Sequence, residues 1–257
     1  MPDVTDSVKL HQQLDLDTKK RHLVFGDIHG RYTTFRRLLD AINYDSATDI
    51  IYSVGDLIDR GPDSVQVVEF FQNEHCHAIL GNHEHMTMCP AEWEDAWMDP
   101  GNGGPMTLRS LKQHGYNLQW LRERVLSFPV CLDVGDESNP QAFRLLHAES
   151  PYCHSEEMLM SNLFYLTRDE VCDSELLWGR SDITRVLEAR KNPDATDVVP
   201  IANGRSLRRV FCGHTPVEGV VSAHNVFWID TFAGNRMTCI NPVSLDIHQE
   251  TIDPADK

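Results

Sequence analysis

The chain is poor in basic residues. It carries 23 lysines and arginines against 39 aspartates and glutamates, which gives a formal net charge of -16 over 257 residues. Proteins that hold duplex nucleic acid or an anionic membrane surface normally present a basic face. The shortage of cations therefore argues against stable nucleic-acid binding and against a membrane-surface role. An anionic substrate has to be attracted locally, by arginines or by metal ions.

Long apolar runs and paired cysteines are also missing. No stretch approaches the ~20 apolar residues that a membrane span requires. Residues 1–20 are polar and lack the apolar segment of a secretory signal. The 7 cysteines are scattered and include no Cys-x-x-Cys pair. This is typical of reduced thiols rather than of a disulfide framework or a zinc knuckle, so we expect a cytoplasmic protein without a membrane span.

What remains is the composition of a globular protein. Hydrophobic residues make up 41% and charged residues 24%, which excludes a disordered chain. No repeat, low-complexity tract or Gly/Ser linker divides the sequence. We expect a polar tail over 1–20, with one short strand near Leu10–Leu16, and a single domain over 21–252. Two less regular segments, near 88–104 and 151–203, are expected to be cap-like insertions in that domain.

A repeated pattern indicates strands that end in polar clusters. A short apolar run comes first and then stops abruptly at Gly, Asp, Asn or His. Such runs occupy residues 22–26, 50–54, 77–80, 143–146 and 209–212. Apolar residues at helical spacing lie between the first three, over 35–42 and 65–71. Buried strands alternating with helices predict an α/β fold.

Potential metal ligands follow these strands. In open α/β sheets the carboxyl edge of the strands is where ligands bind, so sequence-distant clusters can meet there. The side chains offer carboxylate, imidazole and amide oxygen but no thiolate, a set that suits Mn²⁺, Fe²⁺ or Zn²⁺. A histidine at one strand end is a weak signal alone, but all clusters share the same position. The donors exceed one open tetrahedral site and suit two metals that share a carboxylate. They are Asp27, His29, Asp56, Asn82, His147 and His214.

The same clusters carry a family resemblance. In order, they are Gly26-Asp-Ile-His-Gly30, Gly55-Asp-Leu-Ile-Asp-Arg-Gly61, Gly81-Asn-His-Glu84, His147-Ala148 and Gly213-His-Thr-Pro216. This series resembles the calcineurin-like metallophosphoesterases, in particular the phosphoprotein phosphatase branch with its bacterial and phage serine/threonine phosphatases and related diadenosine tetraphosphatases. The resemblance implies an α/β fold in which two central mixed β-sheets pack as a sandwich, flanked by helices, with a dinuclear metal site at the strand ends.

The resemblance also implies how the metals are held and used. A hydroxide that bridges the two ions would attack phosphorus directly, without a phosphoenzyme. The ions are expected to be Mn²⁺, with iron or zinc as alternatives. In this assignment Asp27 and His29 bind the first ion, Asp56 bridges both, and Asn82, His147 and His214 bind the second.

Four further residues gain roles from the resemblance. His83 would donate a proton to the leaving alkoxide, and Asp59 would hold and polarise its imidazole. An imidazole needs such a partner to fix its tautomer and favour its charged form. Arg60 and Arg180 would bind phosphate oxygens, because a guanidinium fork matches phosphate geometry.

Neighbouring polar and aromatic residues are expected to be structural. We interpret Glu84 as a supporting partner rather than a ligand, and Asp230 as the end of a strand near the site. Trp93 and Trp97 lie four residues apart, which favours one helix face packed on the core over a wall of the substrate cleft. The stretch 102–104, Asn-Gly-Gly, either borders the cleft or forms a turn.

The substrate stays open between two classes. The main prediction is a phosphatase of phosphoserine and phosphothreonine in proteins, and the alternative is a hydrolase of dinucleoside polyphosphates. Both use the same metal core, so the partner is a phosphoprotein or a small phosphorylated molecule. Leu80 precedes Gly81 where many relatives have arginine, which weakens the protein-phosphatase prediction. A catalytically inactive scaffold is disfavoured because every expected ligand, His83 and Asp59 are present.

Overall fold

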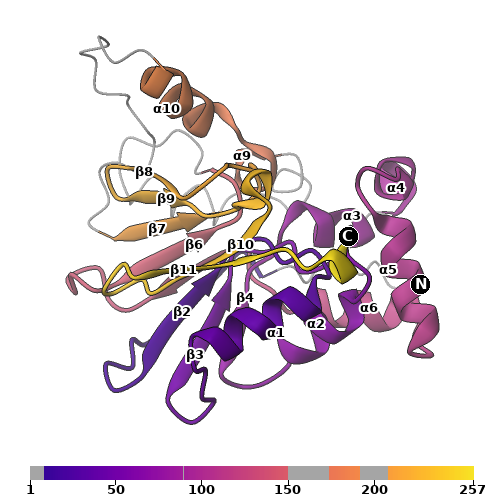
Figure 1. The fold of residues 1–257 in the computed structure, drawn as a ribbon, viewed down its shortest axis with the longest axis horizontal. Helices are drawn as coiled ribbons and strands as arrows, with labels where there is room; N and C mark the ends of the chain where they lie inside the picture. The colour runs from indigo at the N-terminus through magenta and orange to yellow at the C-terminus, as the bar shows by residue number, and fades with distance from the viewer. Residues whose placement is uncertain (1–8, 89, 150–173, 192–207) are drawn as a thin grey trace.

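Two mixed β-sheets face each other and carry helices on their outer sides (Figure 1). This is seen in a computed structural model that describes residues 9–88, 90–149, 174–191 and 208–257. The arrangement confirms the predicted sandwich of mixed sheets flanked by helices. In the part of the chain that the structure describes, no helix is long and apolar enough to cross a membrane.

The smaller sheet has the strand order β11-β10-β2-β3-β4. The parallel strands β2, β3 and β4 are joined by helices and reach one edge of the sheet. Strand β10 pairs antiparallel with β2, and β11 pairs antiparallel with β10 at the other edge. The expected apolar runs and helical segments therefore form a βαβαβ unit. In chain order the elements are β2 (Arg21–Phe25), α1 (Tyr32–Ala41), β3 (Asp49–Ser53), α2 (Ser64–Phe70), β4 (Cys76–Ala78), β10 (Arg236–Ile240) and β11 (Ile247–Thr251).

The larger sheet has the order β1-β5-β6-β7-β9-β8. Its strands are β1 (His11–Leu14), β5 (Cys131–Val134), β6 (Phe143–Leu146), β7 (Arg209–Cys212), β8 (Val221–Ala223) and β9 (Val226–Trp228). Strand β1 falls within the segment 1–20 that the sequence indicates as a tail. It pairs in parallel with β5, so residues 11–14 belong to the sheet.

The segment near 88–104 is more regular than the sequence indicates. It contains helix α4 and the start of α5, joined by a short turn, and these helices contact α3 and α2. The described residues also contain helices α3, α6, α9 and α10 and the 3₁₀ turns η2 and η3. Their bounds are α3 (Asn82–Met88), α4 (Pro90–Met98), α5 (Gly104–Gln113), α6 (Leu118–Val125), α9 (Glu175–Trp178), α10 (Ser181–Lys191), η2 (Phe232–Gly234) and η3 (Pro254–Asp256). Of the insertion near 151–203, only 174–191 lies within the described residues.

Alternation along the strands builds two apolar layers. Val24 of β2 packs in the cluster between the sheets, which includes Tyr52 and Phe143. Its neighbours Leu23 and Phe25 belong to the other cluster, under the helices. Because successive side chains of a strand point to opposite faces, each strand of the sandwich is fixed on both sides. This packing holds the loops at the strand ends in place.

Candidate metal centre

Asp56 is at the centre of a buried polar cluster. Its Oδ2 lies 3.6 Å from His29 Nε2, and its Oδ1 lies 3.4 Å from His147 Nε2. Asp27 Oδ2 is 3.9 Å from the same nitrogen of His29. These residues follow β2, β3 and β6, so both sheets contribute. Since its two oxygens face different groups of donors, the Asp56 carboxylate is placed to be shared between two ions.

Asn82 forms the other half of the cluster. Its Oδ1 lies 2.9 Å from His147 Nε2 and 3.0 Å from His214 Nδ1. Asn82 begins α3 and His214 follows β7. The structure thus brings all of the sequence-predicted ligands together, and the side chain of each is buried.

The hydrogen bonds of two histidines fix which ring nitrogen faces the cluster. His29 Nδ1 lies 2.9 Å from the carbonyl of Ile58, and His147 Nδ1 lies 2.7 Å from that of Val54. A carbonyl only accepts hydrogen bonds, so Nδ1 carries the hydrogen and Nε2 presents a lone pair. These lone pairs face carboxylate and amide oxygens, which are also acceptors. Acceptors that converge in a buried site fit cations, and this donor set fits divalent metal ions.

The three candidate ligand histidines are held neutral. Burial lowers the pKa of His29 well below its usual value, and the nearby Arg60 adds to the effect. Burial also lowers the pKa of His147. It lowers the pKa of His214 to about 3, with a further contribution from His147. Because only neutral imidazole binds metal, this is the protonation state that ligation requires.

The two candidate ligand carboxylates have pKa shifts of opposite direction. Burial raises the pKa of Asp27 well above its usual value, and the negative charges of Asp230 and Asp56 add to it. Burial acts in the same direction on Asp56, but His147, His83 and His29 outweigh it and lower its pKa. Neighbouring carboxylates resist joint ionisation unless cations offset their charge. Divalent ions would supply that charge.

His83 differs from the other histidines in its partner. Its Nδ1 lies 2.8 Å from Asp59 Oδ2, a carboxylate rather than a carbonyl. Its Nε2 faces the cluster, 3.8 Å from Asp56 Oδ2. Burial alone would lower the pKa of His83, but Asp56 and Asp59 outweigh it and raise the pKa. His83 is therefore suited to carry a proton where the candidate ligand histidines are not.

Two arginines reach the rim of the cluster. Arg60 donates from Nη1 to His29 Nε2 at 2.6 Å and contacts His83 Nε2 from Nη2 at 3.2 Å. Arg180 donates from Nε to His214 Nε2 at 3.1 Å. The two guanidinium groups thus approach opposite sets of histidines, where they can bind the oxygens of one phosphate group.

Unusual backbone angles concentrate at this site. Positive φ values occur at His29 (50°), Asp56 (51°), Asp59 (71°), Arg60 (62°) and His214 (66°). The left-handed region is uncommon for residues other than glycine, and such strain persists only where the surroundings impose it. The loops at the strand ends therefore store strain at the residues expected to do the chemistry.

Glu84 is one of the groups that impose this conformation. Its carboxylate accepts hydrogen bonds from the backbone N–H groups of Asp56, Leu57 and Gly81. Gly81 is required by close packing, since a Cβ there would lie 2.2 Å from Asp56 Oδ1. Glu84 thus supports the Asp56 loop, in agreement with its interpretation as a structural partner.

Most of the chain matches one protein family. Residues 20–218 match the family model of the calcineurin-like phosphoesterases. The chain belongs to this family. The resemblance in the sequence motifs is confirmed, and with it the prediction of a hydrolase enzyme that acts on phosphate esters and uses a dinuclear divalent metal site.

Two kinds of named protein are similar to this phosphoesterase. It is 26% identical to serine/threonine-protein phosphatase 1 of Salmonella typhimurium, over 90% of this chain and 95% of that protein. It is 45% identical to a symmetrical bis(5'-nucleosyl)-tetraphosphatase of Wigglesworthia glossinidia brevipalpis, over 24% of each chain. A protein serine/threonine phosphatase structure from Saccharomyces cerevisiae aligns with a TM-score of 0.59 at 15% identity, covering 96% of this chain and 85% of that one. The last likeness shows the shared fold.

Sequence reasoning missed several supporting residues of the phosphoesterase. Trp97 is buried as expected, but its indole N–H donates to the Asp59 carboxylate. Thr107, which no motif singles out, donates to the same carboxylate. Glu149 accepts hydrogen bonds from the backbone of Ser181 and the next residues, and so fixes the turn that carries Arg180. These contacts depend on tertiary packing, so no local spacing reveals them.

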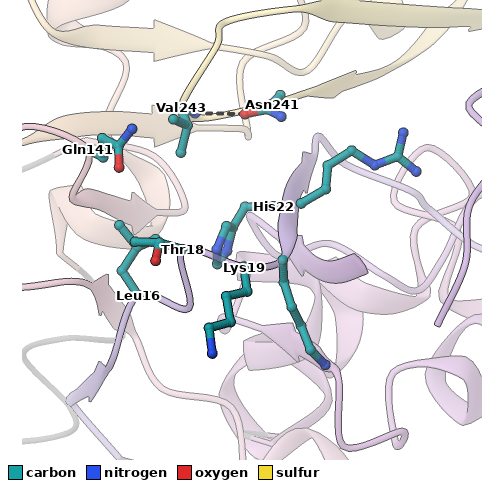
Figure 2. A pocket seen from close by; sticks show the side chains of 9 residues that line it. Leu16, Thr18, Lys19, His22, Gln141, Asn241 and Val243 are labelled. Atoms are coloured by element: carbon teal, nitrogen blue, oxygen red, sulfur yellow. Dashed lines mark hydrogen bonds between the residues drawn. The ribbon is translucent and has the colours of Figure 1, made fainter. Parts of the chain in front are cut away.

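A hollow elsewhere on the phosphoesterase holds none of the expected site residues. It measures about 310 Å³ and lies at the amino end of β2 (Figure 2). Lys19, His22 and Gln141 are among the side chains around it, and Arg21 begins the strand. Asp27 follows the opposite end of β2. The hollow and the polar cluster therefore lie at opposite ends of β2.

Proposed function

We propose that this phosphoesterase removes phosphate from phosphoserine and phosphothreonine in proteins. The proposal rests on how much of the chain resembles each of the two kinds of relative, the protein phosphatases and the tetraphosphatases. Similarity to a serine/threonine-protein phosphatase covers 90% of the chain and 95% of that relative. Similarity to two symmetrical tetraphosphatases covers less, 24% of the chain in one case and 39% in the other. Leu80 is buried in the core at 1% exposure, so that position does not face substrate, and phosphate binding is assigned to Arg60 and Arg180.

We assign two Mn²⁺ ions to the cluster, with iron or zinc as alternatives. When bound, such a pair supplies Lewis acidity toward the phosphate and a nucleophile at neutral pH. The oxygen and nitrogen donors suit these ions. In our assignment Asp27 and His29 would hold the first ion, Asn82, His147 and His214 would hold the second, and Asp56 would be shared between them.

The protein's own residues complete the reaction. Arg60 and Arg180 hold the non-bridging oxygens of the phosphate and orient the ester bond for displacement. When that P–O bond breaks, His83 gives its Nε2 proton to the leaving alkoxide of serine or threonine. Asp59 keeps the imidazole in the required tautomer through Nδ1. The products are the free hydroxyl and inorganic phosphate.

A second candidate is hydrolysis of a dinucleoside polyphosphate. One structural observation favours it: the rings of Trp93 and Trp178 stack with centroids 5.0 Å apart and an interplanar angle of 13°. Trp178 also lies edge-on to His214, 6.1 Å from its ring. An aromatic pair beside the cluster is a surface on which a nucleobase could stack.

We place the protein in the cytoplasm. The proposal is supported by the thiols of Cys76, Cys212 and Cys239, which are buried and free. In reducing compartments such cysteines behave as small hydrophobic residues.

The test compares two substrates on the Mn²⁺-loaded protein, with His83→Asn measured alongside. We expect kcat/KM for a phosphoserine peptide to exceed that for diadenosine tetraphosphate, and His83→Asn to lower turnover of the peptide. A higher kcat/KM for the dinucleotide would replace the main proposal by the second. In that case Trp178→Ala should raise KM for the dinucleotide.

A further inference from the structure

Asp59 has more hydrogen-bond donors than its expected role requires. It is fully buried, at 0% exposure. His83 Nδ1 contacts its Oδ2 at 2.8 Å. Trp97 Nε1 donates to both of its oxygens, at 3.1 Å to Oδ1 and 2.9 Å to Oδ2. Thr107 Oγ1 donates to Oδ1 at 2.5 Å. The carboxylate is therefore held on the sides that do not face His83.

One extra donor, Trp97, lies in the segment 88–104 that the sequence indicates as an insertion, and the other, Thr107, lies just after it. Trp97 is in the last turn of α4, and Thr107 is in the first turn of α5. Asn102 donates from Nδ2 to the carbonyl of Ala96 at 2.7 Å, which ties the connecting turn to α4. Gly104 packs so closely that a Cβ would lie 2.3 Å from the carbonyl oxygen of Trp97. The Asn-Gly-Gly turn thus fixes the spacing between the two donors.

The remaining contacts bind the same group to the scaffold. Thr107 Oγ1 lies 2.9 Å from Ser64 Oγ. Both hydroxyl oxygens also accept from the backbone N–H of Asp59, at 3.0 and 3.1 Å. Asp59 is consequently held at its backbone and at its carboxylate by buried groups of α2 and α5. Such a network prevents the carboxylate from rotating away from the imidazole.

We propose that Trp97 and Thr107 are positioning residues for the general acid. They orient the Asp59 carboxylate so that His83 presents Nε2 to the leaving oxygen. The inference rests on the proposed role of His83 as proton donor. Helices α4 and α5 then support catalysis through two hydrogen-bond donors, the indole N–H of Trp97 and the hydroxyl of Thr107. The size of either side chain matters less for kcat than these two donors do.

The experiment distinguishes the effect of losing each hydrogen-bond donor from the effect of changing the size of the side chain. Thr107→Val removes the hydroxyl at constant shape, Thr107→Ser retains it, and Trp97→Phe removes the N–H while keeping a ring. Each variant is assayed on a phosphoserine peptide, which has a poor leaving group, and on 4-nitrophenyl phosphate, which has a good one. Metal content is measured in parallel. Ser110→Ala is the matched control, because it removes an equally buried hydroxyl of α5 that contacts Val65 N instead.

We expect Thr107→Val to lower kcat on the peptide roughly tenfold or more relative to kcat on 4-nitrophenyl phosphate, with KM unchanged. Trp97→Phe should do the same. Thr107→Ser and Ser110→Ala should keep the wild-type ratio of kcat on the peptide to kcat on 4-nitrophenyl phosphate. Combined with Asp59→Asn, Thr107→Val should cause no further loss, since both act through one carboxylate.

Two results would overturn the inference in distinguishable ways. If His83→Asn leaves the ratio of kcat on the two substrates unchanged, His83 is not the general acid, and the positioning role of Trp97 and Thr107 is wrong as well. If His83→Asn shifts the ratio and neither Thr107→Val nor Trp97→Phe does, the acid role stands and the positioning role is wrong. If Thr107→Val or Trp97→Phe lowers kcat on both substrates equally, the positioning role is also contradicted, because an equal loss is the effect of a structural defect.

Discussion

Histidines of one site differ in the hydrogen-bond partner of a single ring nitrogen, and we propose different roles for them on that basis. Val54 and Ile58 accept from Nδ1 of His147 and His29 through neutral carbonyls, which leaves Nε2 as a lone pair. Asp59 accepts from Nδ1 of His83 with a negative charge, which favours the protonated ring. Residue type alone therefore does not separate ligand from acid, and the hydrogen-bond partner does.

This contrast predicts the effect of His83→Asn. The variant should keep its metal ions, because His83 is not among the assigned ligands. Its kcat on a phosphoserine peptide should fall by about 10² to 10⁴, the usual contribution of general acid catalysis. On 4-nitrophenyl phosphate the loss should be smaller, since that leaving group needs less protonation. Steady-state kinetics on both substrates checks this, and equal losses would remove His83 from the acid role.

Helix α1 illustrates how a distant element stabilises the site loops. Its first turn follows the loop of His29, and Arg31 at the N-cap makes no side-chain cap hydrogen bond. Instead Asp256, from the 3₁₀ turn η3, accepts from the backbone N–H of Thr34 at 2.6 Å and from its hydroxyl. Asp256 and Thr34 are both fully buried. The end of the chain thus satisfies a donor at the start of α1 that would otherwise be orphaned.

Removal of this cap should be measurable as a loss of stability. We expect Asp256→Ala to lower the free energy of unfolding by about 1–2 kcal/mol, as for other N-cap replacements. Glu250→Ala is the control, because it removes only an ion pair with the exposed Arg37 and should change stability much less than Asp256→Ala does. Urea unfolding of the three proteins gives both values, and equal losses in the two variants would deny Asp256 the capping role.

At the scale of the whole molecule, the sequence predicts the strands and their polar ends well. Buried runs such as residues 50–54 are short and apolar, and parallel strands end at one edge, so the meeting of Asp56 with His147 follows. Contacts between distant helices were not predictable. The periodicity that places Trp97 on a helix face says nothing of where its N–H points, and the pairing of β1 with β5 spans more than a hundred residues of chain.

A buried ion cluster holds the larger sheet together. Asp133 of β5 accepts from Arg144 of β6 at 2.6 and 2.8 Å, from Arg208 at 2.8 Å, and contacts His11 of β1 at 3.1 Å. The same neighbourhood contains Cys131 and could formally hold a metal ion. Two guanidinium groups on the carboxylate oppose a cation there, so we interpret the cluster as structural.

The cluster predicts a pH-dependent stability. Burial acts to raise the pKa of Asp133, but His11, Arg144 and Arg208 outweigh it and hold the pKa well below its usual value. The pKa of Asp133 is lower in the folded protein than in the unfolded chain, where it is about 4. The ionised carboxylate therefore contributes its full stability above about pH 4, and this contribution is lost as the pH falls toward the folded pKa.

Asp133→Asn should therefore cost about 3–5 kcal/mol at pH 7. The difference from wild type should narrow below about pH 4, because the Asp133 carboxyl then gains a proton in the unfolded wild type while it stays ionised in the folded one. Urea unfolding at pH 7 and pH 3 measures both. Asp136→Asn, at an exposed position of the same hairpin, should change stability little. A difference that is constant with pH would contradict the assigned pKa shift.

The most direct test of the central claim is the number of divalent metal ions bound per chain, measured by elemental analysis of the Mn²⁺-loaded wild type and of Asp56→Asn. Because Asp56 faces both halves of the cluster, the account predicts two ions in the wild type and a loss at both sites in the variant. Two ions retained in the variant would contradict the bridging role. A single ion in the wild type would contradict the two-metal site itself.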